Sequence, residues 1–421
     1  MSRRRADRLI AVAIVVVALA SACSSGSGDP VEPITVFGNQ RGPDAAALRE
    51  VLARFEDETG IDVRFTGTAS FPRSIRERLE DGNAPDIGLF PQPGLLDDLA
   101  AEGYVLPLRA DVAEMGSRLI LPSLGDAFGA GEAPNGVLFQ VNVKSLVWYP
   151  PAEFTARGYE VPTTWAELEA LTDRMAADGL TPWCMGVSAF DATGWPATDW
   201  VEDIVLRMEG PDVYDAWVSG DLAFTDDRIG AAIAMFGDVV LSDERANGGR
   251  RGVLNTTPAR AQDPMFAVPP GCLMYKQASF QKPNLPKGVT IGEDVDVFVL
   301  PSMGEGAAPI LIGGSVAAAF SNREETWVLM RYLATASAGE PLAQEGGYVS
   351  PHTDFDATAY GDDFDRRMAS ILADADVVRF DGSDLMYSPV GTRTFFDAMV
   401  QFIATERLVT AQETAQSGYD R

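Results

Sequence analysis

The sequence predicts an α/β protein with room for two domains, because strand and helix patterns alternate along a long chain. The chain has 421 residues, of which 46% are apolar, so sizeable cores can form. One domain usually takes ~100–200 residues. Strands that alternate with helices favour a mainly parallel sheet.

The first part of the chain predicts the order strand, helix, strand, helix, strand. Residues 34–37 form a short apolar strand, and apolar residues from Leu48 to Phe55 recur at helical spacing before Gly60 ends the helix. In parallel sheets, ligands bind outside the carboxyl ends of the strands. The remaining patterns predict a strand at 61–65, a helix at 70–80 and a strand at 85–90, so the strand ends run into residues 37–41, 66–71 and 90–93.

Helix and strand signals continue through the second half of the chain. Thr164 and Glu167 form a capping-box pattern that starts a helix, and Gly179 ends it. Further patterns predict a helix at 198–209, a strand at 295–300, a turn at Gly313-Gly314-Ser315, a strand at 316–320, a helix at 324–334 and a loop at 346–351.

The N-terminus has the pattern of an export signal. A basic head with Arg3 to Arg5 precedes an apolar run from Leu9 to Ala22, which is too short to cross a bilayer. Cys23 follows small residues directly, as in the bacterial lipobox, where the cysteine receives a diacylglyceryl chain. We expect a signal peptide at 1–22 and a lipidated Cys23, with a Ser/Gly-rich tether to residue 32. An ordinary secreted protein cut near Ala22 is the alternative.

The chain is strongly acidic, with a formal net charge of −28. The leader carries four Arg and one Asp, so the exported chain would have a charge of about −31. Such a field disfavours nucleic acid and anionic lipid head groups as partners. We expect a monomer that needs no cofactor.

Two cysteines, Cys184 and Cys272, remain after Cys23. An even pair in an exported protein indicates a disulfide, and two buried free thiols are the alternative. His352 is the single histidine and cannot complete a Cys/His metal set, so no metal site is expected.

Six stretches of the chain, taken in order, match a known family. They are Ile34–Gly60, Ala84–Ile87, Asn142–Tyr149, Val161–Leu168, Gly313-Gly314 and Gly346–Pro351. Together they resemble the sugar-type extracellular solute-binding proteins of ABC importers, the family 1 group that includes the maltose-binding proteins.

The resemblance implies a periplasmic-binding-protein fold of type II, with two α/β lobes, an interlobe cleft and a hinge. The chain would cross the hinge near Asn142, Pro301 and Gly347, and the lobes would close on the ligand. Membrane permease subunits of the importer would read the closed state, and no reaction is expected. Lobe 1 would hold 33–142 and 302–347, and lobe 2 would hold 143–301 and 348–421.

Three stretches also resemble the α-glucoside-binding branch of that family: Thr181–Cys184, Thr193–Asp203 and Gly271–Phe280. In that branch two cysteines are similarly placed, which supports the Cys184–Cys272 disulfide. The chain departs from the branch where Ser315 and His352 replace an acidic residue and Asn. The implied ligand is a small carbohydrate, an α-glucoside or a related mono- to trisaccharide.

A sugar needs carboxylates or amides for its hydroxyls and flat rings for its C–H faces, and Trp195, Asp199 and Trp200 supply both. We expect Trp195 to stack on the sugar and Asp199 to accept from a hydroxyl. Trp200 could instead be a core residue of the helix, and so could Trp195. Glu202 and Asp203 are expected on a solvated helix face or as cap charges.

The other candidate ligand residues lie at predicted strand ends and loops. Gln40 and Arg41 could hold hydroxyls, or could be exposed turn residues. Gln92 sits between two prolines, and Phe71 could stack on the ligand or simply cap the core. The remaining candidates are Gly314, Ser315 and Tyr348. A glycine here permits either a close approach of the backbone to the ligand or a hinge turn.

Three other functions compete with sugar capture. An exported glycosidase needs only two carboxylates about 5–9.5 Å apart, but the chain has no G-x-S-x-G, H-E-x-x-H or zinc pattern. The same fold could bind a polyamine, a metal chelate or a phosphorylated solute, although a phosphate calls for clustered Arg or Lys. The third competing function is that of a lipoprotein that delivers its ligand to a sensor instead of a transporter.

Overall fold

The computed structural model describes residues 32–118, 120–128 and 135–420. The predicted signal peptide and Cys23 lie outside these residues. Within them, no helix is both long and apolar enough to pass through a membrane.

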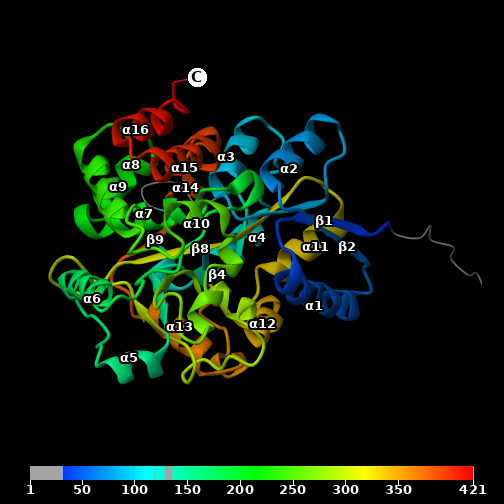
Figure 1. The fold of residues 1–421 in the computed structure, drawn as a ribbon. Coiled ribbons are helices and arrows are strands. Elements are labelled where there is room, and N and C mark those ends of the chain that lie inside the picture. The colour runs from blue at the N-terminus through cyan, green and yellow to red at the C-terminus, as the bar shows by residue number, and fades with distance from the viewer. Residues whose placement is uncertain (1–31, 119, 129–134, 421) are drawn as a thin grey trace, which may run out of the picture. The chain divides into compact units, whose positions relative to one another are not determined.

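The larger sheet has six strands in the order β2-β1-β3-β8-β4, and β9 pairs with β8 (Figure 1). Pairing of β1 with β2 and with β3 is parallel, as the strand–helix alternation predicts. Strands β3 and β4 are antiparallel to β8, so the sheet is mixed. The strands are β1 (Ile34–Gly38), β2 (Val63–Gly67), β3 (Ile87–Phe90), β4 (Val137–Val143), β8 (Ile310–Ala319) and β9 (Val378–Phe380).

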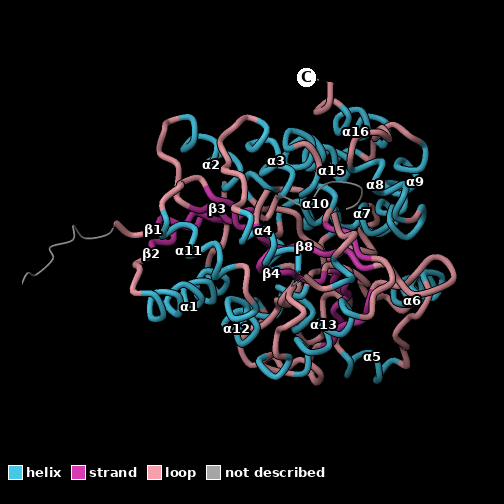
Figure 2. The backbone as a smooth tube through the Cα atoms, turned by 180° about the vertical axis from the view of Figure 1, so that it is seen from behind, coloured by secondary structure: helices cyan, strands magenta, loops and turns pink. Residues whose placement is uncertain are grey.

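Helices cover both faces of the first three strands. Figure 2 shows α2 and α3 on one side of β1 to β3, and α1 and α11 on the other. Helix α1 ends at Gly60, whose φ of 69° is the left-handed conformation that favours glycine. The helices of this region are α1 (Gly42–Thr59), α2 (Phe71–Glu80), α3 (Pro93–Ala101), α4 (Ala110–Arg118), α11 (Glu324–Leu333) and α12 (Ala336–Glu345).

A smaller sheet has the order β6-β5-β7, with both pairings antiparallel. Its strands are β5 (Leu146–Tyr149), β6 (Tyr275–Lys276) and β7 (Asp296–Val299). The helices of the rest of the chain are α5 (Pro151–Arg157), α6 (Trp165–Ala177), α7 (Trp195–Glu209), α8 (Pro211–Val218), α9 (Asp227–Val240), α10 (Gly249–Asn255), α13 (Asp363–Ala373), α14 (Gly382–Leu385), α15 (Phe395–Thr405) and α16 (Leu408–Gln416).

The chain passes between the two sheets at two of the predicted crossings. Strand β4 belongs to the larger sheet and β5 to the smaller one, with only Lys144 and Ser145 between them. The chain returns between β7 and β8, next to Pro301. The assignment of whole ranges to two lobes stays a prediction.

The turn predicted at Gly313-Gly314-Ser315 is wrong, because all three residues lie inside the continuous strand β8. The glycines are needed for space. A Cβ on Gly314 would lie 2.5 Å from the Gln140 carbonyl oxygen, and one on Gly313 would lie 2.8 Å from Lys144 Cε.

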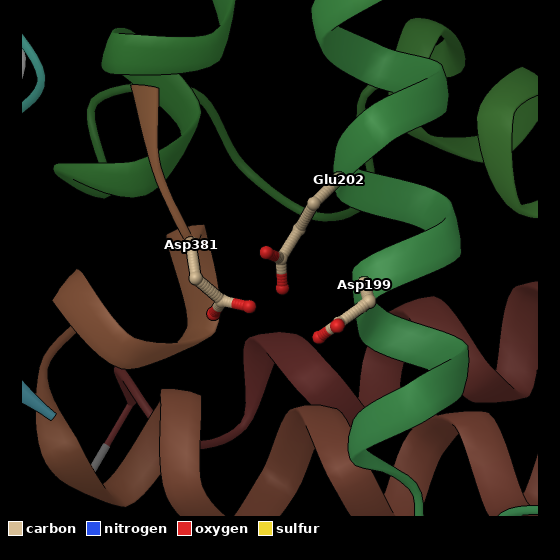
Figure 3. A group of neighbouring side chains, drawn as sticks. All are labelled: Asp199, Glu202 and Asp381. Atoms are coloured by element: carbon tan, nitrogen blue, oxygen red, sulfur yellow. The ribbon is translucent and has the colours of Figure 1, made fainter. Parts of the chain in front are cut away.

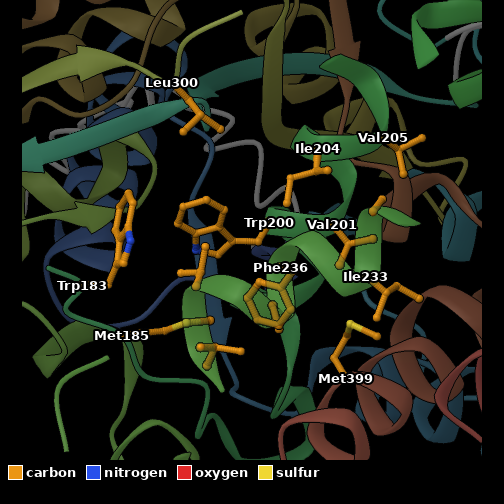
Figure 4. Packing of buried hydrophobic residues seen from close by; sticks show 14 of the residues in the cluster. Trp183, Met185, Trp200, Val201, Ile204, Val205, Ile233, Phe236, Leu300 and Met399 are labelled. Atoms are coloured by element: carbon orange, nitrogen blue, oxygen red, sulfur yellow. The ribbon is translucent and has the colours of Figure 1, made fainter. Parts of the chain in front are cut away.

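Apolar packing around α7 forms one large core. Trp200 lies near Trp183 and Phe236 (Figure 4). Its ring centroid is 5.0 Å from that of Trp183 and 6.5 Å from that of Phe236. Helix α7 is buried along most of its length, and its buried residues include the charged Asp199, Glu202, Asp203 and Arg207 as well as apolar ones.

The predicted disulfide is confirmed. Cys184 and Cys272 are bonded across a sequence separation of 88 residues, with Cα atoms 5.2 Å apart. The bond ties the segment before α7 to the segment that leads into β6. Cys184 N–H also donates to the Met274 carbonyl.

Candidate functional site

A buried polar strip begins on strand β4, which is buried over its whole length. Gln140 and Asn142 lie two residues apart, and Lys144 follows at the same spacing, so the three side chains share one face. Gln140 donates to the Ser315 hydroxyl at 3.2 Å. Opposite them, Gly313 leaves the space that Asn142 and Lys144 fill. The strip therefore ends in a buried ammonium group.

Helix α7 brings two functional side chains, those of Trp195 and Asp199, to Lys144. The helix starts after Gly194, whose φ of 117° and close approach to the Phe396 backbone require glycine. Lys144 Nζ lies 3.2 Å from Asp199 Oδ1 and 5.7 Å from the centroid of the Trp195 ring. Trp195 is half-buried, so part of the residue remains accessible.

The third contribution comes from the N-terminus of α14. Strand β9 ends beside β8, and Asp381 N–H donates to the Ile312 carbonyl at 2.8 Å. This places the Asp381 carboxylate in direct contact with Lys144 Nζ. Asp381 also caps α14 by accepting from Asp384 N–H at 2.9 Å. Asp384 Oδ2 is 4.0 Å from Lys144 Nζ.

Glu202 fixes α14 to α7. Its two carboxylate oxygens accept from the backbone N–H groups of Gly382 and Ser383, at 2.8 and 3.1 Å. Figure 3 shows the carboxylates of Asp199, Glu202 and Asp381 directed toward one shared space. We call Lys144 and the four carboxyl groups of Asp199, Glu202, Asp381 and Asp384 the acidic cluster.

Burial and mutual repulsion shift the pKa values in the acidic cluster. Burial raises the pKa of Asp199 to about 7, although Lys144 opposes the shift. Burial raises the pKa of Glu202 and of Asp384 well above the ordinary range, with repulsion from Asp381 adding to it. Contact with Lys144 overcomes burial at Asp381 and lowers its pKa to about 2. The carboxyl groups of the cluster therefore compete for one counter-charge, Lys144, and Asp381 is its strongest partner.

The acidic cluster is arranged for an internal ammonium group. Oxygens of Asp199, Glu202 and Asp381 lie within 4.8 Å of one another, a spacing that could hold a metal ion. Lys144 Nζ contacts two of these carboxylates, and backbone N–H groups saturate the third. The donor set thus fits the lysine that is present.

Three carboxamide oxygens near the cluster have no hydrogen-bond partner: Gln40 Oε1, Gln92 Oε1 and Asn142 Oδ1. Gln40 reaches the strip through its amide nitrogen, which donates to Ser315 at 3.2 Å. Gln92 hydrogen-bonds Asp384. Buried carbonyl oxygens without partners are rare in native proteins, so these atoms indicate where a ligand would donate.

The structure brings six of the predicted ligand residues to this region. They are Gln40, Gln92, Trp195, Asp199, Gly314 and Ser315. Gly314 contributes space and a strand pairing with Val141, and no side chain.

Four other predicted ligand residues lie elsewhere. Phe71 is 1% exposed and packs between Phe37 and Phe90, with centroids 5.5 and 5.1 Å away. Trp200 lies in the α7 core, and Arg41 is exposed. Tyr348 is buried and hydrogen-bonds Asp44. For Phe71 and Trp200 the core alternative describes the observed position.

The expectation that Glu202 and Asp203 lie on a solvated face is wrong, because both are 0% exposed. Asp203 accepts from the Ser145 hydroxyl at 2.6 Å and lies 2.8 Å from Lys276 Nζ. It also pairs with Arg207 one turn later on α7. Arg207 in turn donates to the carbonyls of Leu300, Pro301 and Pro309, so this second network holds the chain between β7 and β8.

Sequence reasoning missed Lys144, Gln140, Glu202, Asp381 and Asp384 as site residues. The alternation Gln140-x-Asn142-x-Lys144 was a usable signal, since a polar face on an otherwise apolar strand must meet polar partners. Asp381 and Asp384 carry a capping spacing, but nothing local shows that this cap faces α7.

Solved structures of solute receptors have this fold. The receptor AcbH aligns with a TM-score of 0.77 at 20% identity, over 92% of this chain and 98% of that chain. A chitin oligosaccharide binding protein aligns with a TM-score of 0.76 at 18% identity, over 94% and 100%. The fold is therefore the two-lobed α/β fold of solute-binding proteins, as expected.

The particular family follows from the sequence. Residues 39–340 match the family Bacterial extracellular solute-binding protein, and the chain belongs to that family. It is thus an extracytoplasmic solute receptor and not an enzyme. The osmoprotective compounds-binding protein GgtB of Synechocystis sp. (strain ATCC 27184 / PCC 6803 / Kazusa) is 40% identical over 88% of each chain. The alpha-glucosides-binding periplasmic protein AglE of Rhizobium meliloti (strain 1021) is 34% identical over 92% of this chain and 87% of that protein.

Proposed function

We propose that this receptor captures a small α-glucoside, of one to three sugar units, at the acidic cluster and delivers it to the permease of an ABC importer. The observation that carries the proposal is the half-buried Trp195 ring beside Lys144 and Asp199, with unpartnered amide oxygens close by. A flat ring and convergent polar groups are what a sugar requires.

The chemistry of the cluster suits hydroxyl groups. A hydroxyl both donates and accepts, and a carboxyl group near its pKa can do either. Asp384 is the most exposed carboxyl of the cluster, with 14% of its side chain accessible, so it is the one most available to a ligand. Trp195 offers the apolar surface for the sugar's C–H face.

The relatives support the ligand class. GgtB is named for osmoprotective compounds and AglE for alpha-glucosides, and both align with nearly the whole chain. The three stretches that resemble the α-glucoside branch include Trp195 and Asp199, which the structure places beside Lys144.

We also propose that the protein is held at the cell membrane by a lipid on Cys23. Support comes from the basic head, the short apolar run and the small residues before Cys23. Intact-mass analysis of protein from the membrane fraction should show a diacylglyceryl modification. Cys23→Ala should release the protein from that fraction, and unchanged retention would contradict the anchor.

Calorimetric titration tests the ligand. The ligand panel is methyl α-D-glucopyranoside, maltose, trehalose and glucosylglycerol, with glycerol, spermidine and inorganic phosphate as non-sugar probes. We expect saturable one-site binding to at least one α-glucoside and no release of glucose from it. Tight binding to a non-sugar probe alone, or release of a cleaved product, would overturn the proposal.

A further inference from the structure

The acidic cluster holds more buried carboxyl groups than its one cation can balance. Four carboxyl groups face a single ammonium group, Lys144 Nζ, which contacts Asp199 and Asp381 and lies 4.0 Å from Asp384. Glu202 is held by two backbone N–H groups, which carry no net charge. An excess of carboxylate in a buried site must be relieved by protons or by a cation from outside.

The neighbouring cations are already committed. Lys276 and Arg207 both pair with Asp203, and Lys276 also donates to the backbone carbonyl of Asp199 at 3.1 Å. The other N–H groups of Arg207 donate to backbone carbonyls between β7 and β8. No cationic side chain among them is left to receive an anionic ligand.

An independent observation points to what the ligand must offer. The unpartnered atoms of Gln40, Gln92 and Asn142 are all oxygens, and Gln40 and Asn142 are 5% and 6% exposed. The Asn142 amide lies beside Lys144, because both flank the space over Gly313. Gln92 reaches Asp384 from the carboxyl end of β3. Acceptors without partners call for a ligand that donates.

We propose that Asp384 makes this site selective for charge, so that it admits neutral and ammonium-bearing α-glucosides and excludes anionic ones. This inference rests on the proposed function and names its substrate class more closely. An ammonium group would supply a donor, and its positive charge would favour the ionised form of Asp384. A carboxylate or phosphate would add acceptors to a site that already has too many, next to like charge.

A matched series of ligands tests the proposal on the full exported chain. Methyl α-D-glucopyranoside is compared with its 6-amino-6-deoxy derivative and with methyl α-D-glucopyranosiduronic acid, which differ only at C6. α-D-Glucose 1-phosphate places a negative charge at the other end of the ring. Affinities are measured by calorimetry near pH 7.5 at low and at moderate salt.

We expect the uronic acid and the phosphate to bind at least about tenfold more weakly than the neutral glucoside, which corresponds to about 1.4 kcal/mol. The amino derivative should bind as well as the neutral glucoside or better. The Asp384→Asn variant should bring the charged and neutral ligands to within about threefold of one another, which is a difference of under 1 kcal/mol.

Asp57→Asn is the matched control, because Asp57 is exposed on α1 and its replacement makes the same Asp-to-Asn change away from the acidic cluster. It should leave the selectivity unchanged, which separates the local effect of Asp384 from the overall acidity. If Asp384→Asn unfolds, Asp384→Glu is used, and the selectivity should persist.

The outcomes separate this inference from the proposed function. Binding of all four ligands with similar affinity would overturn charge selectivity and leave sugar capture standing. Selectivity that survives in Asp384→Asn would show that Asp384 does not determine it. Binding of none of the four would overturn the charge selectivity, and sugar capture would fall with it only if no α-glucoside of the calorimetric panel binds either.

Discussion

Lys144 is the residue on which the acidic cluster depends. It stands at the crossing between the two sheets, where its backbone N–H donates to the Leu311 carbonyl at 2.8 Å. Its ammonium group is the common neighbour of Asp199, Asp381 and Asp384. Burial opposes the charge of Lys144, but the carboxylates around it raise its pKa well above 10.5.

Replacing Lys144 with Met should destabilise the protein strongly, because it leaves carboxylates buried without a counter-charge. Loss of one partner from a buried ion pair usually costs about 3–5 kcal/mol. The loss should shrink as the pH falls from about 8 to about 5. Carboxyl groups whose folded pKa exceeds the unfolded value take up protons preferentially in the folded state, and the folded state gains stability as pH falls.

Urea unfolding of wild type and Lys144→Met across that pH range checks the prediction. Lys287→Met is the matched control, because Lys287 is exposed. A deficit in Lys144→Met that stays constant with pH would contradict the electrostatic explanation.

Trp195 and Trp200 lie on the same helix and should respond oppositely to truncation. Trp195→Ala should weaken sugar binding by about 2 kcal/mol or more, as buried aromatic anchors do, with little change in Tm. Trp200→Ala should lower stability by about 3–5 kcal/mol, because its ring fills the α7 core. A large loss of stability in Trp195→Ala with unchanged affinity would assign Trp195 to the core.

At the scale of elements, α7 joins the site to the crossing between the sheets. Its first half carries Trp195, Asp199 and Glu202, and its second half carries Asp203 and Arg207. Arg207 holds the chain between β7 and β8, while Ser145 between β4 and β5 donates to Asp203. One buried helix therefore contacts both connections between the two sheets.

The disulfide should stabilise the region before α7 and the approach to β6. In the chain-entropy model, closing a loop of this length lowers the conformational entropy of the unfolded chain. This stabilises the folded state by roughly 4–5 kcal/mol at 25 °C. The double variant Cys184→Ser/Cys272→Ser should therefore have a clearly lower Tm than the oxidised wild type. Reduced wild type should match the variant, and an unchanged Tm under reduction would contradict the prediction.

Local patterns predicted most elements but few of the site's charges. Periodicity and caps sufficed for α1, α2, α6 and β3, because those signals lie within one segment. The sequence predicts Glu202 and Asp203 on a solvated face or as cap charges, because a charge on a helix normally faces water. Their partners, Gly382 and Lys276, lie far away in sequence, so no local signal revealed them. The turn predicted at the glycines of β8 is wrong for the same reason. The groups that need the space at Gly313 and Gly314 belong to β4 and to Lys144, which lie far away in sequence.

At the scale of the whole molecule, the receptor has two sheets, and the buried polar strip of β4 runs into the connection between them at Lys144. Apolar clusters surround the helices on either side, and the acidic cluster lies where β4, β8, α7 and the start of α14 meet. A small α-glucoside at that place would contact residues of the larger sheet together with residues of α7 and α14.

A crystal structure of the protein grown with an α-glucoside that binds in the calorimetric panel tests the central claim most directly. We expect the sugar ring against Trp195, with hydroxyl groups within hydrogen-bond distance of Asp384 and of at least one of Gln40, Gln92 and Asn142. A sugar bound elsewhere, such as in the surface hollow lined by Asp238, Arg245 and Glu406, would contradict the account.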